Sequence, residues 1–406
     1  MGLFKRGELK LLWPFYLDEL ISTMLFFMPA FYVIYFRDLG FSLFQISLLM
    51  AMMPLFMLLF EIPTGAIADI YGRKFSVILS YIIQGFAYIL IFFLDNFYAL
   101  LFAFALIGFG STFISGAKEA WVTDLINKDR KTFLHNYFVK RDSLCSAGLV
   151  VSGILGAFLV KQYGVAIMWI AAGISFFISL LLLMLAKEHF IRRKPKIKDS
   201  FKNVNKQTII SLKYVRNHNV LFLFIIASSL LFFAGAFSGS LSWISFFQSL
   251  KFPDYAFGYL WSSINILGIF APFVSIKLMK KGKERKFLII SVLLGMLALS
   301  MILFADIISV AFVILISSMF FADVSRPVES IYFQKLIKSK LRATVGSIRN
   351  MLSEIVGIVA LPLAGLSVDY LGARYTIFLS ALLIIPSLIL LLMIKENRKI
   401  TERKLI

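Results

Sequence analysis

The sequence has little cysteine, little charge and none of the short motifs that mark common enzyme sites. One cysteine among 406 residues, Cys145, excludes an intramolecular disulfide. There is no phosphate-binding Gly-Lys loop, no His-Glu-x-x-His and no nucleophile elbow, so we expect neither an enzyme nor a cofactor or metal site. Charged residues make up only 16% of the chain. Because soluble domains contain roughly a quarter, an ordinary water-soluble fold is excluded.

What the sequence does contain is apolar: hydrophobic residues account for 60% of it, and the mean hydropathy is +0.88. Apolar runs long enough to cross roughly 30 Å of hydrocarbon recur along the whole chain, each ending at a polar or charged break. We therefore predict an all-α membrane protein with transmembrane helices near 11–36, 43–66, 75–94, 97–123, 142–163, 165–186, 219–248, 256–279, 287–305, 307–334, 344–368 and 374–394.

The net charge of +20 is distributed unevenly between alternate loops. With a cytoplasmic N-terminus, only Arg37, Lys161, Lys251 and Arg374 of the 42 Lys and Arg residues fall in outer loops. Cytoplasmic loops of membrane proteins are enriched in Lys and Arg, so this pattern predicts a multi-pass protein of the cell (inner) membrane with both termini in the cytoplasm. The basic loops would meet anionic membrane lipids, and we expect no nucleic acid partner.

The longest polar stretch separates six expected spans from six. We predict six-helix bundles over residues 1–188 and 219–406, joined by a cytoplasmic linker over 189–218. Apolar residues recur at helical spacing in this linker, which predicts an amphipathic helix on the inner membrane surface; they are Phe201, Val204, Thr208, Leu212 and Val215. A merely solvated basic linker is the alternative.

The two halves also resemble each other in the placement of charged residues. Arg141 precedes Arg349 by 208 residues, and Glu119 precedes Glu329 by 210. Since each half contains an even number of spans, both enter the membrane in the same orientation. The sequence therefore predicts a parallel repeat related by an axis along the membrane normal.

A conspicuous segment, Gly65-Ala-Ile-Ala-Asp69-Ile-Tyr-Gly72-Arg73-Lys74, stands between the second and third spans. The two glycines permit a tight turn, and Asp69 and Arg73 supply opposite charges that can bridge neighbouring helices. The spacing resembles the loop signature of the major facilitator superfamily, and the twelve spans in two halves are similar to that family over essentially the whole chain. The resemblance implies two bundles around a cavity near the midplane, with alternating access by rocking.

The resemblance further implies that this loop is a conformational latch. Asp69 and Arg73 would hold the cytoplasmic side of the outward-facing state against the start of the eleventh span and an acid of the fourth span. In this sequence that acid is Asp124 or Glu119. The equivalent loop of the second half, residues 280–286, lacks the acid of the signature, so the latch is expected to be asymmetric.

Ionisable residues inside the expected spans are expected to be paired, hydrated or functional. A charge at mid-membrane costs at least roughly 2.5 kcal/mol unless it is paired or hydrated. The residues concerned are Asp18, Glu19, Lys118, Glu119, Asp142, Asp323, Arg326, Glu329, Arg349 and Glu354. We expect Glu119 with Arg141, and Glu329 with Arg349, to form structural or gating salt bridges near the cytoplasmic ends of the helices.

Coupling to protons requires a carboxylate that can load and release a proton near neutral pH. Histidine is excluded as a relay because all three histidines fall in expected cytoplasmic loops: His135, His189 and His218. The candidates for proton coupling or substrate binding are Asp18, Glu19, Asp323, Arg326 and Glu354. Asp323 and Glu354 lie deepest by position, so we predict that one of them carries the proton; permanently paired structural acids are the alternative.

The predicted function is secondary active transport of a small-molecule substrate by a monomer. The loop resembles that of drug antiporters, and 44 Phe and 15 Met residues suit an adaptable apolar cavity, which favours proton-coupled export of a small amphipathic or apolar solute. A proton-coupled symporter that imports a small polar nutrient is one alternative, because Asp323 with Arg326 suits a zwitterion. A non-transporting membrane sensor is another.

Overall fold

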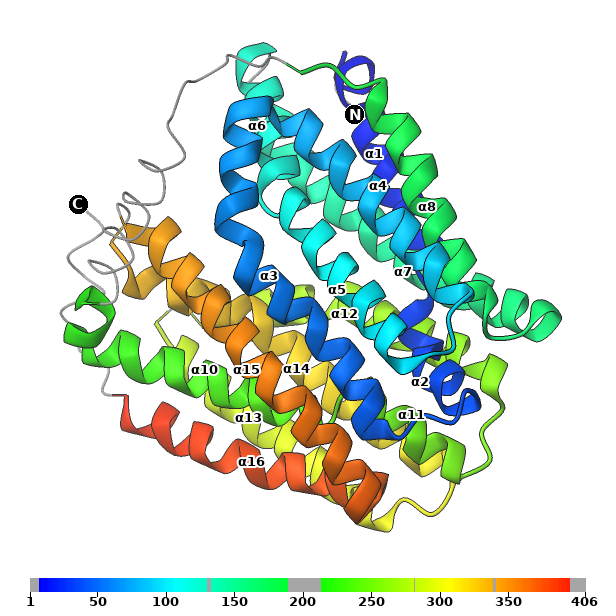
Figure 1. The fold of residues 1–406 in the computed structure, drawn as a ribbon. Coiled ribbons are helices and arrows are strands. Elements are labelled where there is room, and N and C mark those ends of the chain that lie inside the picture. Colours follow the sequence, from blue (N-terminus) through cyan, green and yellow to red (C-terminus); the bar gives the residue numbers. More distant parts are fainter. Residues whose placement is uncertain (1–6, 130–132, 189–212, 281, 339–340, 395–406) are drawn as a thin grey trace. The chain divides into compact units, whose positions relative to one another are not determined.

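The structure, a computed structural model, describes residues 7–129, 133–188, 213–280, 282–338 and 341–394. Helices make up nearly all of these ranges and no strand occurs within them, which confirms the expected all-α fold (Figure 1). The helices are α1 (Glu8–Met24), α2 (Met28–Asp38), α3 (Leu43–Tyr71), α4 (Arg73–Phe92), α5 (Phe97–Ile114), α6 (Ala117–Asp129), α7 (Leu134–Tyr163), α8 (Ile167–Met184), α10 (Asn219–Phe237), α11 (Ser240–Ser249), η2 (Asp254–Ala256), α12 (Phe257–Leu278), α13 (Glu284–Ser300), η3 (Met301–Phe304), α14 (Ile308–Leu336), α15 (Arg342–Leu371) and α16 (Ala373–Met393). The amphipathic helix expected in the linker falls mostly on residues 189–212, which lie outside the described ranges.

Within the described residues, 12 helical stretches are long and apolar enough to cross a membrane. They occur in the predicted order, which confirms the expected number of spans. The largest difference is at the fifth span, which begins at Asn136 and not near residue 142. Tyr137 and Lys140 extend this helix because their side chains contact Tyr16 and Glu8 of α1.

Three of the described spans consist of two α-helices each. The first span breaks between α1 and α2, and the seventh breaks at the equivalent place between α10 and α11. The fourth span breaks between α5 and α6 at Ser115 and Gly116, where Gly116 has φ +67 and therefore a backbone conformation that glycine adopts without strain. Each break ends one helix and sets the direction of the next.

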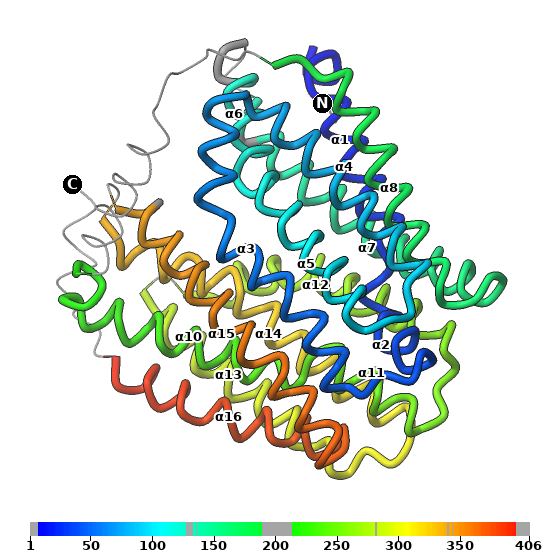
Figure 2. Tube along the Cα trace, viewed as in Figure 1, coloured from blue at the N-terminus to red at the C-terminus, as the bar shows by residue number. Residues whose placement is uncertain are grey.

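The chain splits into two compact units, whose helices can be followed in chain order in Figure 2. Unit 1 comprises residues 1–202 with 253–266, and unit 2 comprises residues 203–252 with 267–406. The units therefore differ from two consecutive halves in one respect, because η2 and the first part of α12 belong to unit 1.

Small residues bring the first part of α12 close to α7 within unit 1. A Cβ atom on Gly258 would lie 2.3 Å from the carbonyl oxygen of Gly153, so only glycine permits this approach. Ser262 Oγ adds a hydrogen bond to the carbonyl oxygen of Val150 at 2.6 Å. The small residues of the fifth span thus serve close helix packing.

The same helix pairings recur in both units. In unit 1, α1 packs against α7 and α8, and α4 packs against α5 and α8. In unit 2 the corresponding helix α10 packs against α15 and α16, and α13 packs against α14 and α16. An interhelical hydrogen bond is also repeated, from Thr64 to the carbonyl oxygen of Thr112 and from Ser275 to that of Val324. These recurrences confirm the predicted pair of parallel-repeat six-helix bundles.

Candidate functional site

Unit 1 contains a buried charge cluster made of Asp18 and Glu19 of α1, Tyr81 of α4 and Lys118 of α6. Lys118 Nζ lies 2.6 Å from Asp18 Oδ2 and 3.1 Å from Glu19 Oε2. Tyr81 donates its hydroxyl to Asp18 Oδ1 at 3.0 Å. The exposed fractions of the side chains are 0% for Asp18, 14% for Lys118 and 17% for Glu19. The tertiary structure thus gathers acids and a base that lie about a hundred residues apart in the sequence.

The break between α5 and α6 places Lys118 in the first turn of α6, facing α1. The orientation of α6 is fixed by Trp121, which is 1% exposed. Its ring packs edge-to-face on Phe15 at a centroid distance of 4.9 Å, and its Nε1 donates to the carbonyl oxygen of Lys187 at 2.9 Å. Aromatic packing of this kind and a satisfied indole N–H hold the helix, and Lys118 with it, in one position.

The buried charge cluster contains one more acid than base. Buried charges are tolerated when they are paired and their remaining hydrogen-bonding positions are satisfied. Asp18 meets this condition through Lys118 and Tyr81. Glu19 shares the same ammonium group, so a single cation neutralises only one of the two carboxylates. The cluster can therefore accept a proton or another cation without any loss of charge balance.

The loop signature between α3 and α4 ties three helices of unit 1 together. Gly72 has φ +105 and ends α3, after which α4 begins directly at Arg73. Lys74 Nζ donates to the carbonyl oxygens of Met184 and Ala186 near the end of α8, at 2.8 Å and 2.7 Å. Its backbone N–H donates to Glu188 Oε1 at 2.9 Å. A lysine at the carboxyl end of a helix is favoured because the last carbonyl groups lack helical partners.

Three other members of the signature differ in their surroundings. Arg73 forms an ion pair with Asp124 and donates to the carbonyl oxygen of Ala120 at 2.6 Å. Of the two acids expected opposite it, the structure thus brings Asp124 to Arg73. Asp69 is exposed and has no hydrogen bond or ion pair with any described residue of unit 1, and Gly65 has open space around it. The role of this loop as a latch stays a prediction.

The structure brings together both pairs that the repeat suggested. Arg141 Nη1 lies 2.8 Å from Glu119 Oε1, and Arg349 forms an ion pair with Glu329. Each guanidinium also lies over a phenylalanine ring, at 5.0 Å from the centroid of Phe138 in unit 1 and 4.8 Å in unit 2, where the ring is that of Phe333. Cation–π contacts of this kind favour arginine over lysine. The pair of acid and arginine is thus repeated in the two units, whereas the phenylalanine comes from the arginine's helix α7 in unit 1 and from the acid's helix α14 in unit 2.

In unit 2, Asp323 and Arg326 lie on the same face of α14. Arg326 Nη1 is 2.8 Å from Asp323 Oδ1, and the exposed fractions are 72% for Arg326 and 11% for Asp323. Glu354 of α15 is half-buried. Burial therefore does not follow depth along the span, because Asp18, expected nearer the inner third, is more buried than Asp323 or Glu354. Which of these acids carries a proton stays a prediction.

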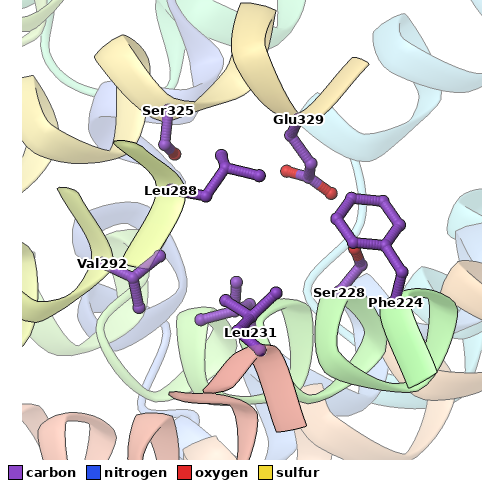
Figure 3. A pocket seen from close by; sticks show the side chains of 8 residues that line it. Phe224, Ser228, Leu231, Leu288, Val292, Ser325 and Glu329 are labelled. Atoms are coloured by element: carbon purple, nitrogen blue, oxygen red, sulfur yellow. The ribbon is translucent and has the colours of Figure 1, made fainter. Parts of the chain in front are cut away.

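A small pocket lies inside unit 2 between α10, α13, α14 and α16. Its cavity volume is about 10 Å³, and it is lined mainly by apolar side chains with Ser228, Ser325 and Glu329. The carboxylate of Glu329 is directed toward it (Figure 3). Ligand sites typically have roughly 300 Å³ or more, so this pocket is too small to serve as the main substrate site.

Sequence reasoning missed three acids. Glu61 of α3 is half-buried within a span, and its side chain has no hydrogen bond or ion pair with any described residue of unit 1. The sequence does contain a signal for Glu61, because it is an acidic residue within the apolar run of residues 43–66. Glu8 and Glu284 are buried and paired with Lys140 and Lys335. They lie just before expected spans, where the sequence indicates water contact, so no signal indicated their burial.

Comparisons with known proteins identify relatives of low sequence identity over most of the chain. An uncharacterized MFS-type transporter of Bacillus subtilis (strain 168) is 23% identical over 374 residues, covering 89% of this chain and 88% of the relative. A second uncharacterized MFS-type transporter, from Methanocaldococcus jannaschii, is 23% identical over 213 residues, covering 52% of this chain and 54% of the relative.

Solved structures share the fold. The nucleoside transporter NupG matches with a TM-score of 0.74 at 12% identity, covering 94% of this chain and 98% of that one. A POT family transporter in complex with 5-aminolevulinic acid matches with a TM-score of 0.76 at 14% identity, covering 96% of each chain. The family model of the Major Facilitator Superfamily matches residues 19–361. With the twelve spans and the repeated bundles, this match shows that the chain is a membrane transporter that belongs to the Major Facilitator Superfamily.

Proposed function

We propose that this transporter is coupled to protons and exports a small amphipathic or apolar solute by alternating access. The observation that carries the proposal is the buried charge cluster of unit 1, in which Asp18 and Glu19 share the single cation Lys118. The surplus carboxylate provides a place for one proton inside a membrane span, where ionisable residues usually have a functional role. Glu19 and Lys118 keep some exposure, and we propose that a proton reaches the cluster on this exposed side.

Movement of the proton is proposed to change which partner Lys118 holds. When both carboxylates are ionised, Lys118 bridges α1 and α6 through Asp18 and Glu19. A proton on Glu19 removes one of these two ion pairs and weakens the connection between the helices. A solute that binds preferentially to one of the two states would then be coupled to the proton, because a ligand shifts an equilibrium only through differential affinity.

The ion pairs at the ends of the helices are proposed to act as gates and as a latch. Arg73 with Asp124 and Arg141 with Glu119 connect neighbouring helices of unit 1, and Arg349 with Glu329 does so in unit 2. The two pairs of unit 1 include the exposed acids Asp124 and Glu119, and ion pairs of this kind contribute roughly 1 kcal/mol or less. They are therefore weak enough to open and close during a transport cycle.

We propose that the protein lies in the cell (inner) membrane with both termini in the cytoplasm. The transporting unit is proposed to be the monomer. The orientation rests on the excess of Lys and Arg in alternate loops. Anionic lipids would contact these loops.

The test is a flux measurement in proteoliposomes with an imposed pH gradient. Wild-type protein is expected to move protons in exchange for solutes drawn from a panel of amphipathic compounds. Asp18→Asn and Glu19→Gln are expected to lower coupled flux at least roughly tenfold, as expected for removal of a positioned acid. Asp95→Asn, an exposed acid in the connection between α4 and α5, is the matched control and should leave flux unchanged.

The same assay tests whether the proton is carried by the buried charge cluster of unit 1 or by the acids of unit 2. If Glu354→Gln or Asp323→Asn abolishes coupling while Asp18→Asn and Glu19→Gln do not, the proton is carried in unit 2 and the cluster is structural. If wild-type protein moves no proton with any solute, proton coupling itself is refuted.

A proton-coupled symporter that imports a small polar solute is the second candidate. The ion pair of Asp323 with Arg326 favours it, since opposite charges close together suit a zwitterion. An efflux-deficient host that expresses the chain distinguishes the two functions. Raised tolerance of amphipathic drugs, lost in the Glu19→Gln variant, supports export. Unchanged tolerance together with substrate-dependent proton uptake supports import.

A further inference from the structure

The inner half of α14 carries an exposed ridge of small and polar residues: Ala322, Arg326, Ser330 and Gln334. These residues are spaced four apart, so they lie above one another along one face of the helix. They are exposed, whereas Val324, Val328 and Tyr332 on another face are buried in unit 2. We call this face the α14 ridge.

The outer half of the same helix has a different exposed surface. Its exposed large side chains are all apolar, namely Ile308, Val310, Phe312 and Val313. Apolar side chains of this kind suit contact with lipid. An arginine, a serine and a glutamine in a row do not, because polar residues within spans face the protein interior or water. The α14 ridge is therefore expected to line a water-filled path.

Arg326 presents a largely unoccupied guanidinium on this ridge. Only its Nη1 is engaged, by Asp323 Oδ1 at 2.8 Å, and no other hydrogen bond or ion pair of Arg326 occurs among the described residues of unit 2. A guanidinium has five N–H donors in a planar fork that matches two oxygen atoms at once. One edge of the fork therefore stays available to a ligand.

Asp323 orients this group without covering it. Its side chain is 11% exposed and lies next to α12, where a Cβ on Gly268 would be 3.6 Å from Asp323 Oδ2. The acid thus lies on the buried side and the guanidinium on the exposed side. A ligand that approaches from water meets the positive end of the pair first, because the closer charge dominates the interaction.

We infer that Arg326 recognises a planar or tetrahedral oxyanion of the transported solute, and that the solute is an amphipathic organic anion carrying a carboxylate or a phosphate. Bidentate binding of such groups is the characteristic use of arginine. The inference rests on the proposed transport function. It refines the solute class, because an apolar body with an anionic head is one form of amphipathic solute.

The single cysteine of the chain makes a sharp test possible. In the Cys145→Ala background, Ser330→Cys and Gln334→Cys probe the α14 ridge, and Val313→Cys and Ile331→Cys are controls on apolar exposed positions. The reagents are two membrane-impermeant methanethiosulfonates, one with a sulfonate and one with a trimethylammonium group. Ridge positions are expected to react, and the apolar controls are expected to stay unlabelled.

The charge preference at Ser330→Cys tests the role of Arg326. The measured quantity is the labelling rate with the sulfonate reagent divided by the labelling rate with the ammonium reagent, each corrected for the reagent's rate with a free thiol. This ratio is expected to fall roughly tenfold upon Arg326→Gln. Any change in thiol reactivity affects both reagents equally and cancels in the ratio. Arg326→Lys keeps the charge and should retain most of the preference. A ratio unaffected by Arg326→Gln, or an unlabelled ridge, would overturn the inference.

Protection of Ser330→Cys from labelling by added ligands distinguishes a carboxylate from a phosphate. Phenylacetate, phenyl phosphate and phenethylamine share an aromatic body and differ in the head group. Protection by phenylacetate points to a carboxylate and protection by phenyl phosphate to a phosphate. Protection by phenethylamine alone, or by neither anion, counts against the inference. Because labelling requires no flux, a transporter without proton coupling would still give the expected labelling, and the two proposals fail separately.

Discussion

Unit 1 and unit 2 share their helix pairings but differ in where they place charge. Unit 1 buries Asp18 and Lys118 between α1 and α6, with Asp18 fully inaccessible. The counterpart of α1 in unit 2, α10, contains no charged residue at all. In unit 2, Asp323, Arg326 and Glu329 lie on α14, Arg349 and Glu354 lie on α15, and Arg326 is mostly exposed. The comparison indicates that the scaffold is constrained by packing, whereas the chemistry of each unit is free to differ.

Where the two units do agree, the shared feature lies at the ends of the helices. Glu119 with Arg141, and Glu329 with Arg349, each combine an ion pair with a cation–π contact, but the ring belongs to the arginine's helix in unit 1 and to the acid's helix in unit 2.

Removal of one partner should be much more costly for the Asp18–Lys118 ion pair of unit 1 than for the Asp323–Arg326 ion pair of unit 2. Lys118→Met leaves two carboxylates without a cation, of which Asp18 is fully buried, and we expect a loss of about 3–5 kcal/mol in the free energy of unfolding. Asp323→Asn leaves Arg326 in contact with water, and we expect about 1 kcal/mol or less. Denaturant unfolding of the purified protein in detergent measures both. Equal losses would contradict the difference in burial.

The close approach of α7 and α12 should tolerate no side chain. In Gly153→Ala the new Cβ atom would lie 2.2 Å from the carbonyl oxygen of Gly258, and we expect a destabilisation of about 1–3 kcal/mol. Gly235→Ala in α10 of unit 2 is the matched control. Since a Cβ there meets no atom within 4 Å, this change should be neutral or stabilising by up to about 1 kcal/mol. Thermal unfolding midpoints of the two variants test the difference, and similar midpoints would argue against it.

The two repeat-related ion pairs should differ in strength in spite of their similar geometry. Glu329 is 22% exposed and Glu119 is 61% exposed, and Arg141 keeps a second partner, Asp142, at 2.8 Å. We expect Glu329→Gln to destabilise by about 1–3 kcal/mol and Glu119→Gln by about 1 kcal/mol or less. The measurement is again the free energy of unfolding, and the salt dependence of the Glu119 effect is a second check. A larger effect of Glu119→Gln would refute the ranking.

The repeated interhelical hydrogen bonds should contribute least. Ser275 Oγ lies 2.7 Å from the carbonyl oxygen of Val324, and Thr64 Oγ1 lies 3.3 Å from that of Thr112. We expect Ser275→Ala to destabilise by about 0.5–1.5 kcal/mol and Thr64→Val by less, because its bond is longer. Thermal unfolding midpoints of the two variants, compared with wild type, provide the check. A greater loss of stability in Thr64→Val than in Ser275→Ala would contradict this prediction.

Much of the fold could be predicted from hydropathy and charge. Runs of about 20 apolar residues fix a membrane span locally, and this is why the spans occur in the predicted number and order. The fifth span was placed too late because Tyr137 and Lys140 read as polar, although their partners in α1 stabilise the helix there. Such partners lie far away in the sequence and leave no local signal.

The candidate site was less predictable from the sequence. The sequence identifies Asp18, Glu19, Lys118 and the repeat-related pairs as ionisable residues inside expected spans, where a charge is costly unless it is paired or hydrated. It ranked Asp323 and Glu354 above Asp18 by depth along the span, whereas Asp18 has the greatest burial. It left open whether Asp124 or Glu119 faces Arg73, and it overlooked Glu61. Burial and pairing depend on the rotation of each helix about its axis, which an irregular apolar pattern does not determine.

Hydropathy alone predicts twelve membrane-spanning helices in two related halves, because the transfer of apolar side chains from water to lipid depends on composition over one helix length. Which charges meet follows from helix packing, since Lys118 reaches Asp18 across a hundred residues of chain through the break before α6 and the packing of Trp121. Hydropathy is a local sum over neighbouring residues, whereas an ion pair requires two particular helix faces to be turned toward each other.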